Sequence, residues 1–165
     1  GTRTTLFASG YEYKWWPHAM RCYSHLRNFC DKITQKNDST PYELRHNKKF
    51  EGKLVQFGKL VYYKPSNPRL TDRLQKFGDR TLEGIFIGYH MHPGGKWSGD
   101  YLVMDALDFI SSDRGAHIHI NRIKEIVVLE QLKFPIKDAF IIGVRPSLSP
   151  KLRSAPKLRS SLTKT

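Results

Sequence analysis

Four aspartates form the densest group of carboxylates in the sequence, and carboxylate oxygens are the ligands that Ca²⁺ and Mg²⁺ prefer. They are Asp100, Asp105, Asp108 and Asp113. A metal-binding loop sets its ligands at short fixed intervals, and no such pattern surrounds these residues. The pattern therefore favours hydrated residues at strand ends and turns, and we predict no metal site here.

Histidine and cysteine offer two further kinds of chemistry. His117 and His119 alternate with isoleucines and could share a zinc ion on one strand face, but no third ligand follows at a suitable spacing. Cys22 lies near His18 and His25, a combination that could support nucleophilic catalysis. Because Cys22 falls on a predicted core helix, a buried structural thiol is the favoured interpretation. We predict no catalytic residue and no metal ligand in this chain.

Lysine and arginine side chains indicate a different function, contact with phosphate groups. Many of them fall in a long loop from Ser66 to Glu83 and beside a turn at His92–Gly95. Such side chains bind nucleic acid with little sequence preference, and aromatic residues at strand ends can stack on bases. The alternatives are a solvated loop for the cations and a core or rim position for aromatic residues such as Tyr63. The predicted nucleic-acid-binding residues are Lys59, Lys64, Arg69, Arg73, Lys76, Arg80, Lys96 and Trp97.

The charge of the whole chain supports a polyanionic partner. It carries 28 Lys and Arg against 15 Asp and Glu over 165 residues, a formal charge of +13. The excess lies in residues 1–100 and 144–165, whereas residues 101–143 hold five cations and six anions. Nucleic acid is favoured over the alternatives, a basic solubilising surface or a membrane-facing patch.

Two negative features restrict the class of protein. Two cysteines are too few for a disulfide framework, so we expect a reducing intracellular compartment. No apolar run approaches the roughly 20 residues of a membrane-spanning helix, and we expect no membrane partner.

Three helices are predicted before residue 50. The first covers Thr2–Ser9, and Gly10 ends it in a left-handed conformation. The third begins with a capping box, Thr40-Pro41-Tyr42-Glu43. The second starts near Pro17, and its apolar residues at helical spacing predict that both cysteines are buried. Those residues are Trp16, Met20, Tyr23, Leu26 and Cys30.

From Leu54 onward the apolar residues recur with a period of two, which indicates strands. Five short runs follow, separated by turn residues, and such a series predicts a small, strongly bent antiparallel barrel. The fold class expected is therefore mainly β with N-terminal helices. The predicted strands are Leu60–Tyr63, Ile85–Tyr89, Tyr101–Met104, His117–Ile120 and Ile126–Leu129.

These elements divide the chain into helices (residues 1–50), a barrel (51–130) and a linker with a basic tail (131–165). The tail repeats Pro-Lys-Leu-Arg-Ser at Pro150–Ser154 and Pro156–Ser160. Its prolines and cations cannot build a core, so we expect a disordered segment. Its cations could add nonspecific phosphate contacts or act as a nuclear import signal. Because the chain begins with Gly1 and not Met, we expect it to be a piece of a longer polypeptide.

Several short motifs resemble, in their order, the polyproteins of copia-type retrotransposons. Thr40-Pro41-Tyr42-Glu43-Leu44 precedes Phe57-Gly58, and Gly84–Tyr89 and Tyr101–Asp105 follow. This block is similar to the retroviral-polymerase SH3-like domain, a five-stranded barrel that lies behind the integrase catalytic core. The chain departs from the family at Lys59, where a cysteine is usual.

The preceding segment resembles the end of the integrase core itself. Leu6–Gly10 and Trp15–Ala19 are similar to the closing helices of that RNase H-like domain. Such integrases hold two divalent metals with two Asp and one Glu, and the resemblance places all three upstream of Gly1. It therefore implies a non-enzymatic portion that needs no cofactor of its own.

The function implied is to hold DNA for a catalytic core during DNA integration in the nucleus. The expected partners are DNA and the remainder of the integrase polyprotein, alone or as an oligomer. The alternative is a protein-interaction or assembly module that packs on the integrase core or on another subunit. That alternative predicts exposed apolar surface on the early helices, where Trp15, Trp16 and Phe29 would have lost their core partners.

Overall fold

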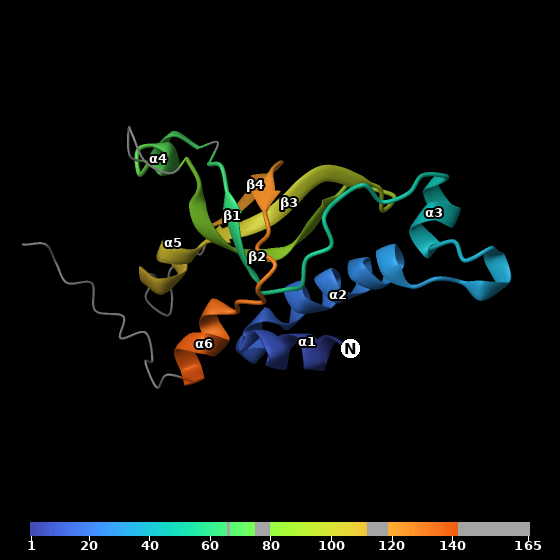
Figure 1. Ribbon diagram of the computed structural model, residues 1–165, viewed down its shortest axis with the longest axis horizontal. Helices are drawn as coiled ribbons and strands as arrows, with labels where there is room; N and C mark the ends of the chain where they lie inside the picture. Colours follow the sequence, from blue (N-terminus) through green and yellow to red (C-terminus); the bar gives the residue numbers. More distant parts are fainter. Residues whose placement is uncertain (66, 75–79, 112–118, 142–165) are drawn as a thin grey trace, which may run out of the picture.

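The computed structural model describes residues 1–65, 67–74, 80–111 and 119–141, without the side chains of residues 69, 110, 111 and 139–141. A five-stranded antiparallel sheet forms one layer, and helices α1 (Thr2–Ser9) and α2 (Trp16–Cys30) lie along one side of it (Figure 1). The fold is thus a mixture of helix and strand, and the expectation of a mainly β fold needs correction.

The N-terminal helices begin and end where local sequence signals predict. Gly10 ends α1 with φ 75°, and a short 3-10 turn at Tyr13–Trp15 leads into α2. Helix α3 (Pro41–His46) has the predicted capping box: Glu43 N donates to Thr40 Oγ1 at 3.2 Å, and Thr40 N donates to Glu43 Oε2 at 3.1 Å. The other helical segments are Thr34–Lys36, α4 (Pro68–Thr71), α5 (Ala106–Ser111) and α6 (Pro135–Ile141).

The sheet has the strand order β4-β3-β2-β1-β5, with every neighbouring pair antiparallel. Four of the five predicted strands overlap β1, β2, β3 and β5, although β2 and β3 are longer than predicted and β5 is shorter. The strand predicted at His117–Ile120 shares only Ile120 with β4. β4 starts at Ile120, and His117 lies outside the described residues. In the described part of the chain no pairing joins β4 to β5, so the sheet is open. The strands are β1 (Leu60–Tyr63), β2 (Leu82–Met91), β3 (Trp97–Asp105), β4 (Ile120–Ile123) and β5 (Ile126–Val127).

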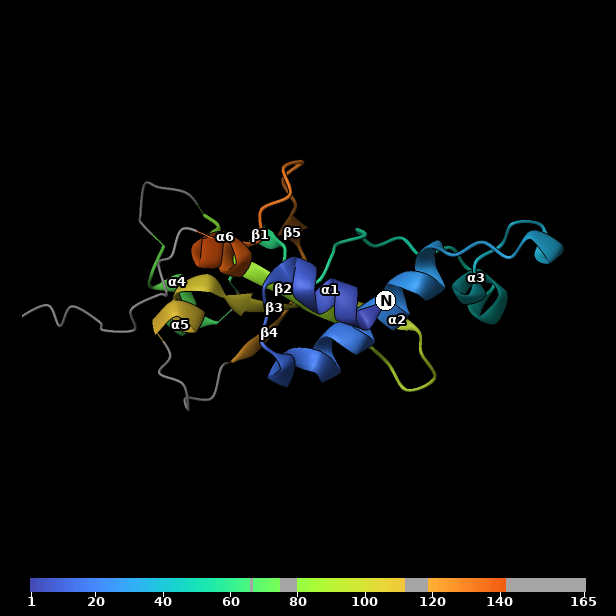
Figure 2. The ribbon, with the colours of Figure 1, turned by 90° about the horizontal axis from the view of Figure 1, so that it is seen from below.

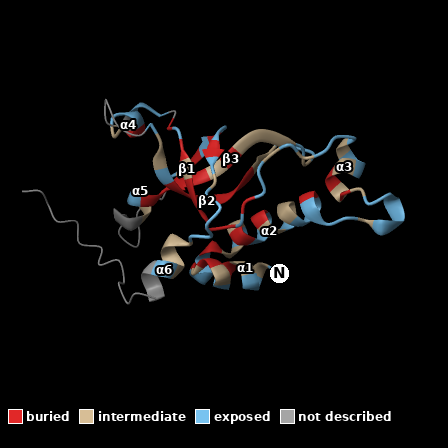
Figure 3. Cartoon of the chain, viewed as in Figure 1, coloured by how far each residue is buried: buried red, intermediate tan, exposed pale blue. Residues whose placement is uncertain are grey.

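One continuous core joins the helices to the sheet, as the buried residues in Figure 3 show. Trp15 and Phe29 are buried, and the Phe29 ring lies 5.2 Å from that of Tyr89 on β2. The predicted boundary at residue 50 therefore does not separate two cores.

Trp15 and Phe29 are buried, and Trp16 is half-buried, in contrast to the exposure that the assembly-module alternative predicts for them. Phe7 and Tyr13 in the same N-terminal region are exposed, however, so apolar surface does occur there.

Helix α2 buries a different stripe from the one predicted. The buried stripe runs from Trp15 through Ala19 to Cys22, and the last two are fully buried. On the predicted stripe, Met20 is 45% exposed and Cys30 is also exposed. The predicted burial of both thiols is therefore correct for Cys22 and wrong for Cys30. The spacing of apolar residues allowed either stripe, and the position of the sheet selects one.

Gly58 joins the sheet to α1 by a close backbone approach. Its φ is +79°, and a Cβ atom there would stand 2.6 Å from the Cβ of Ser9. Any larger residue would push the loop before β1 away from α1. Helix α6 lies beside the same, C-terminal end of α1 (Figure 2), where a Cβ atom on Gly10 would stand 2.7 Å from Lys137 Cα. None of the described helices is both long and apolar enough to cross a bilayer.

Candidate nucleic-acid interface

The base of the long loop presents two of the predicted cations. Lys64 and Arg80 are exposed, and they flank the end of the β1–β2 ladder, where Tyr63 pairs with Leu82. Neither is joined to another described residue by an ion pair. Arg69 belongs to α4, but its side chain is outside the described part of the structure, and Lys76 lies wholly outside it.

Arg73 is placed differently from the prediction, because it folds inward. Its Nη1 lies 3.0 Å from Asp105 Oδ1 and 3.7 Å from Asp108 Oδ1. Asp105 is fully buried and also accepts hydrogen bonds from the Tyr63 hydroxyl at 2.8 Å and the Leu107 and Asp108 amides at 3.0 Å. A buried carboxylate needs such partners, so Arg73 serves the core and is removed from the proposed interface.

The same contacts correct the interpretation of the carboxylate group. Asp105 is a buried hydrogen-bond acceptor and not a hydrated strand-end residue, and Asp100 accepts from Arg122 at 2.7 Å. Asp113 falls outside the described residues. No cluster of three potential metal ligands occurs among the residues that the structure describes.

Lys59 is also removed from the predicted set. Its side chain is buried, and Nζ donates to the Leu129 carbonyl at 2.8 Å. This hydrogen bond holds the segment after β5 close to the start of β1, and the ammonium group does not face outward. Nothing in the local sequence signals this role, because Leu129 is distant from Lys59 along the chain. The two residues come together only because β5 pairs with β1 in the sheet.

The two candidate stacking residues have structural positions, as their alternative interpretation predicts. Trp97 is half-buried against Phe50 and Tyr101, at ring separations of 4.9 and 5.3 Å, and its Nε1 donates to the Asp100 carbonyl at 3.0 Å. Tyr63 is buried, and burial, together with its hydrogen bond to Asp105, raises the pKa of its hydroxyl.

Lys96 gains neighbours that the sequence analysis missed. The β2–β3 hairpin tip packs against α3: His46 Nε2 lies 3.1 Å from the Gly95 carbonyl, and Trp97 N donates to the Tyr42 hydroxyl at 3.3 Å. Arg45 extends over the tip, since its Nη1 would lie 3.7 Å from a Cβ atom on Gly95. Figure 1 shows α3 beside this end of the hairpin.

A third exposed cation, Lys49, lies in the segment that follows α3. It precedes Phe50, whose ring packs on Trp97, the residue after Lys96. Arg45, Lys49 and Lys96 are all exposed, and none has an ion pair to a described residue, whereas neighbouring Lys48 pairs with Glu51 at 3.1 Å. We call these three residues the hairpin–α3 patch. Of these three residues the sequence analysis predicted Lys96 alone, because α3 meets the hairpin turn, 49 residues further along the chain, only through tertiary contact.

The Cys22 thiol on helix α2 is fully buried. Burial raises the pKa of the Cys22 thiol to about 12, so the reactive thiolate is disfavoured. Burial, and then the nearby charge of Arg21, lowers the pKa of His18 and of His25. A structural role for Cys22, as predicted, is consistent with both effects.

Comparison of the chain with protein-family models, with curated proteins and with solved structures found no match. Its function must therefore be argued from its own residues.

Proposed function

We propose that this chain binds duplex DNA through its phosphates and holds it in place without cutting it. The observation that carries the proposal is the hairpin–α3 patch, where contact between two distant segments places exposed Arg45 at the hairpin tip that carries exposed Lys96, with exposed Lys49 in the segment after α3. None of the three has an ion pair to a residue that the structure describes. Each such cation placed on a phosphate releases a counterion, which favours binding. The formal charge of +13 adds a long-range attraction for any polyanion.

A second contact is proposed at the base of the long loop, through Lys64 and Arg80. This pair and the hairpin–α3 patch lie at opposite ends of β2, which is ten residues long and so spans about 30 Å. One turn of duplex DNA covers a similar length, about 34 Å. A duplex lying along the strand could therefore reach both groups of cations.

We further propose that the chain is the SH3-like portion of a copia-type integrase, with the end of the catalytic core before it. The order of the family motifs and the five antiparallel strands support this assignment. A closed barrel remains part of the proposal, as do action in the nucleus and association with the rest of the polyprotein. The carboxylates of Asp100 and Asp105 are bound to arginine side chains, which supports a role that is not catalytic.

The experiment is a titration of a fluorescent 20-base-pair duplex with the full chain at several salt concentrations, followed by anisotropy. We expect about micromolar affinity at low salt, falling linearly on logarithmic axes with a slope of several units. Binding that is indifferent to salt would contradict phosphate contact. Cleavage of the duplex in the presence of Mg²⁺ or Mn²⁺ would contradict the non-catalytic role.

A further inference from the structure

The stretch from Lys53 to Gln56 is an extended segment that is hydrogen-bonded along one edge. The hydroxyl groups of two tyrosines of the sheet form hydrogen bonds with the backbone of Lys53 and Val55. Lys53 N donates to Tyr101 Oη at 2.7 Å, Val55 N donates to Tyr89 Oη at 2.9 Å, and Tyr89 Oη donates to the Lys53 carbonyl at 2.9 Å. Val55 is buried, whereas Leu54 is 56% exposed and Gln56 is exposed. Such alternation is typical of a strand.

The opposite edge of this segment is open. In a strand the amides and carbonyls of alternate residues face opposite sides, so those of Leu54 face away from the tyrosines. No described residue donates to or accepts from the Leu54 backbone, and none accepts from Gln56 N; the Gln56 carbonyl accepts from Lys59 N at 3.2 Å. An open strand edge is a template for another extended chain.

A groove runs beside this edge, between it and the two N-terminal helices. Its volume is about 520 Å³, and its lining is mostly apolar, with small or hydroxylated residues on α1. In Figure 1 the segment runs back from α3 towards β1 above α2. The residues that a ligand would touch include Thr4, Ala8, Leu26, Cys30, Leu54 and Phe57.

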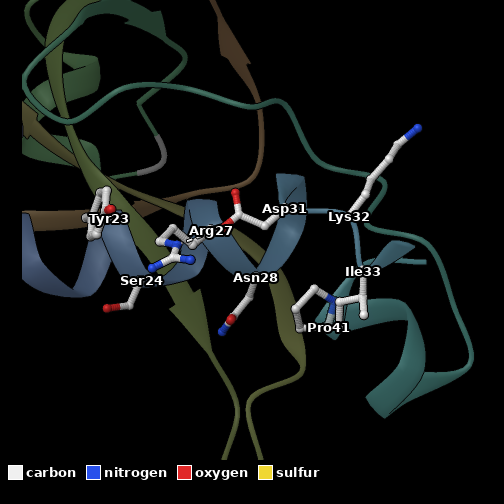
Figure 4. A pocket seen from close by; sticks show the side chains of 8 residues that line it. All are labelled: Tyr23, Ser24, Arg27, Asn28, Asp31, Lys32, Ile33 and Pro41. Carbon is white, nitrogen blue, oxygen red and sulfur yellow. Dashed lines mark hydrogen bonds and ion pairs between the residues drawn. The ribbon is translucent and has the colours of Figure 1, made fainter. Parts of the chain in front are cut away.

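The polar end of the groove continues along α2. Figure 4 shows Arg27 and Asp31 directed at one another there, with Lys32 reaching outward beyond the helix. At the other end, exposed Lys133 precedes Phe134, which lines the groove. The two charged residues that line the groove, Arg27 and Asp31, form an ion pair, so the excess positive charge lies at its ends, on Lys32 and Lys133.

We propose that this groove binds an extended peptide of alternating apolar and acidic residues, which adds as a strand to the Leu54 edge. Main-chain hydrogen bonds supply affinity in this mode, and alternate side chains enter the adjacent groove. The apolar side chains would face Leu26 and Phe57. The acidic side chains would meet Lys32 and Lys133, and the chain's own basic tail is disfavoured because its cations would meet the same lysines.

The test uses the full chain and a synthetic, capped (Val-Glu)₄ peptide, with (Val-Lys)₄ as the matched control. Hydrogen exchange of backbone amides is followed by NMR. We expect the Leu54 amide to exchange rapidly alone and to slow about tenfold or more when the acidic peptide saturates the groove. The Val55 amide, already bonded to Tyr89, should change little. The lysine peptide should bind about tenfold more weakly.

Three variants separate the edge from the rest of the surface. Leu54→Pro removes the unpartnered amide and the groove-lining side chain together, so Leu54→Ala, which keeps the amide, is its matched control. In folded proteins, peptide binding should be about tenfold weaker for the proline variant than for the alanine variant. Arg45→Gln with Lys96→Gln alters the proposed DNA surface and should leave peptide binding unchanged, so failure of either proposal can be recognised separately.

The inference is overturned if neither peptide protects Leu54 up to about 1 mM. It is also overturned if the amide is already protected in the free chain, which would indicate the chain's own tail. Protection that grows with protein concentration would indicate a second copy and would likewise contradict it.

Discussion

At the scale of single residues, burial decides which charged side chains are available to a ligand. Arg73 and Lys59 are cations in a basic region, yet the first neutralises Asp105 and the second caps the Leu129 carbonyl. Sequence cannot distinguish them from exposed Lys64 or Arg80, because their partners are distant along the chain. Only the tertiary structure distinguishes the buried cations from the exposed ones.

The Asp105 network should make a large contribution to stability. Asp105→Asn removes the charge that Arg73 and the Tyr63 hydroxyl face, and we expect the free energy of unfolding to fall by about 3 kcal/mol. Tyr63→Phe removes one hydrogen bond and should cost about 1 kcal/mol. Urea denaturation followed by circular dichroism measures both. Equal, small losses for the two variants would show that the buried carboxylate is not the centre of the network.

The histidines of α2 should make the fold sensitive to acid. The pKa values of His18 and His25 are lowered in the folded chain, so the unfolded chain binds more protons below its ordinary histidine pKa of about 6.5. Their contribution is therefore complete above that pH and is lost as the pH falls towards the lowered values. Urea midpoints measured between pH 7.5 and 5 should show this loss, and His18→Gln with His25→Gln should flatten it. An unchanged profile in the double variant would refute the assignment.

At the scale of elements, helices and strands follow local signals, whereas their faces and contacts do not. The capping box of α3 and the left-handed Gly10 after α1 were predictable because both signals lie within a few residues. The stripe that α2 buries was not, since apolar residues lie on more than one of its faces. The extended segment at Lys53–Gln56 was also missed, because side-chain hydroxyls take the place of a neighbouring strand.

The contact between the loop before β1 and α1 depends on Gly58. Gly58→Ala should lower the free energy of unfolding by about 3 kcal/mol, because the positive φ is strained and the new Cβ meets Ser9. Gly94→Ala is the matched control: its φ is +92°, but nothing lies within 4 Å of a Cβ there, so about 1 kcal/mol is expected. Thermal unfolding of both variants tests the difference, and equal losses would mean that the close approach is unimportant.

At the scale of the whole molecule, one core unites the helices with the sheet and holds cations at both ends of β2. The number of strands and the overall charge were predictable from the sequence. The shared core was not, because the resemblance suggested helices separated from their own domain. The hairpin–α3 patch belongs to this packing, since the Phe50 ring stacks on Phe29 of α2 and contacts Trp97 of β3 beside the place where α3 meets the hairpin.

The most direct test of the central claim compares two triple variants in the DNA titration. Arg45→Gln, Lys49→Gln and Lys96→Gln together remove the hairpin–α3 patch, whereas Arg3→Gln, Arg21→Gln and Lys124→Gln remove the same charge from exposed positions elsewhere. The first should weaken binding about 30-fold and reduce the salt slope by about 2.7 units, and the second should change both far less. Equal losses in the two variants would contradict the account, because binding would then depend on net charge and not on this surface.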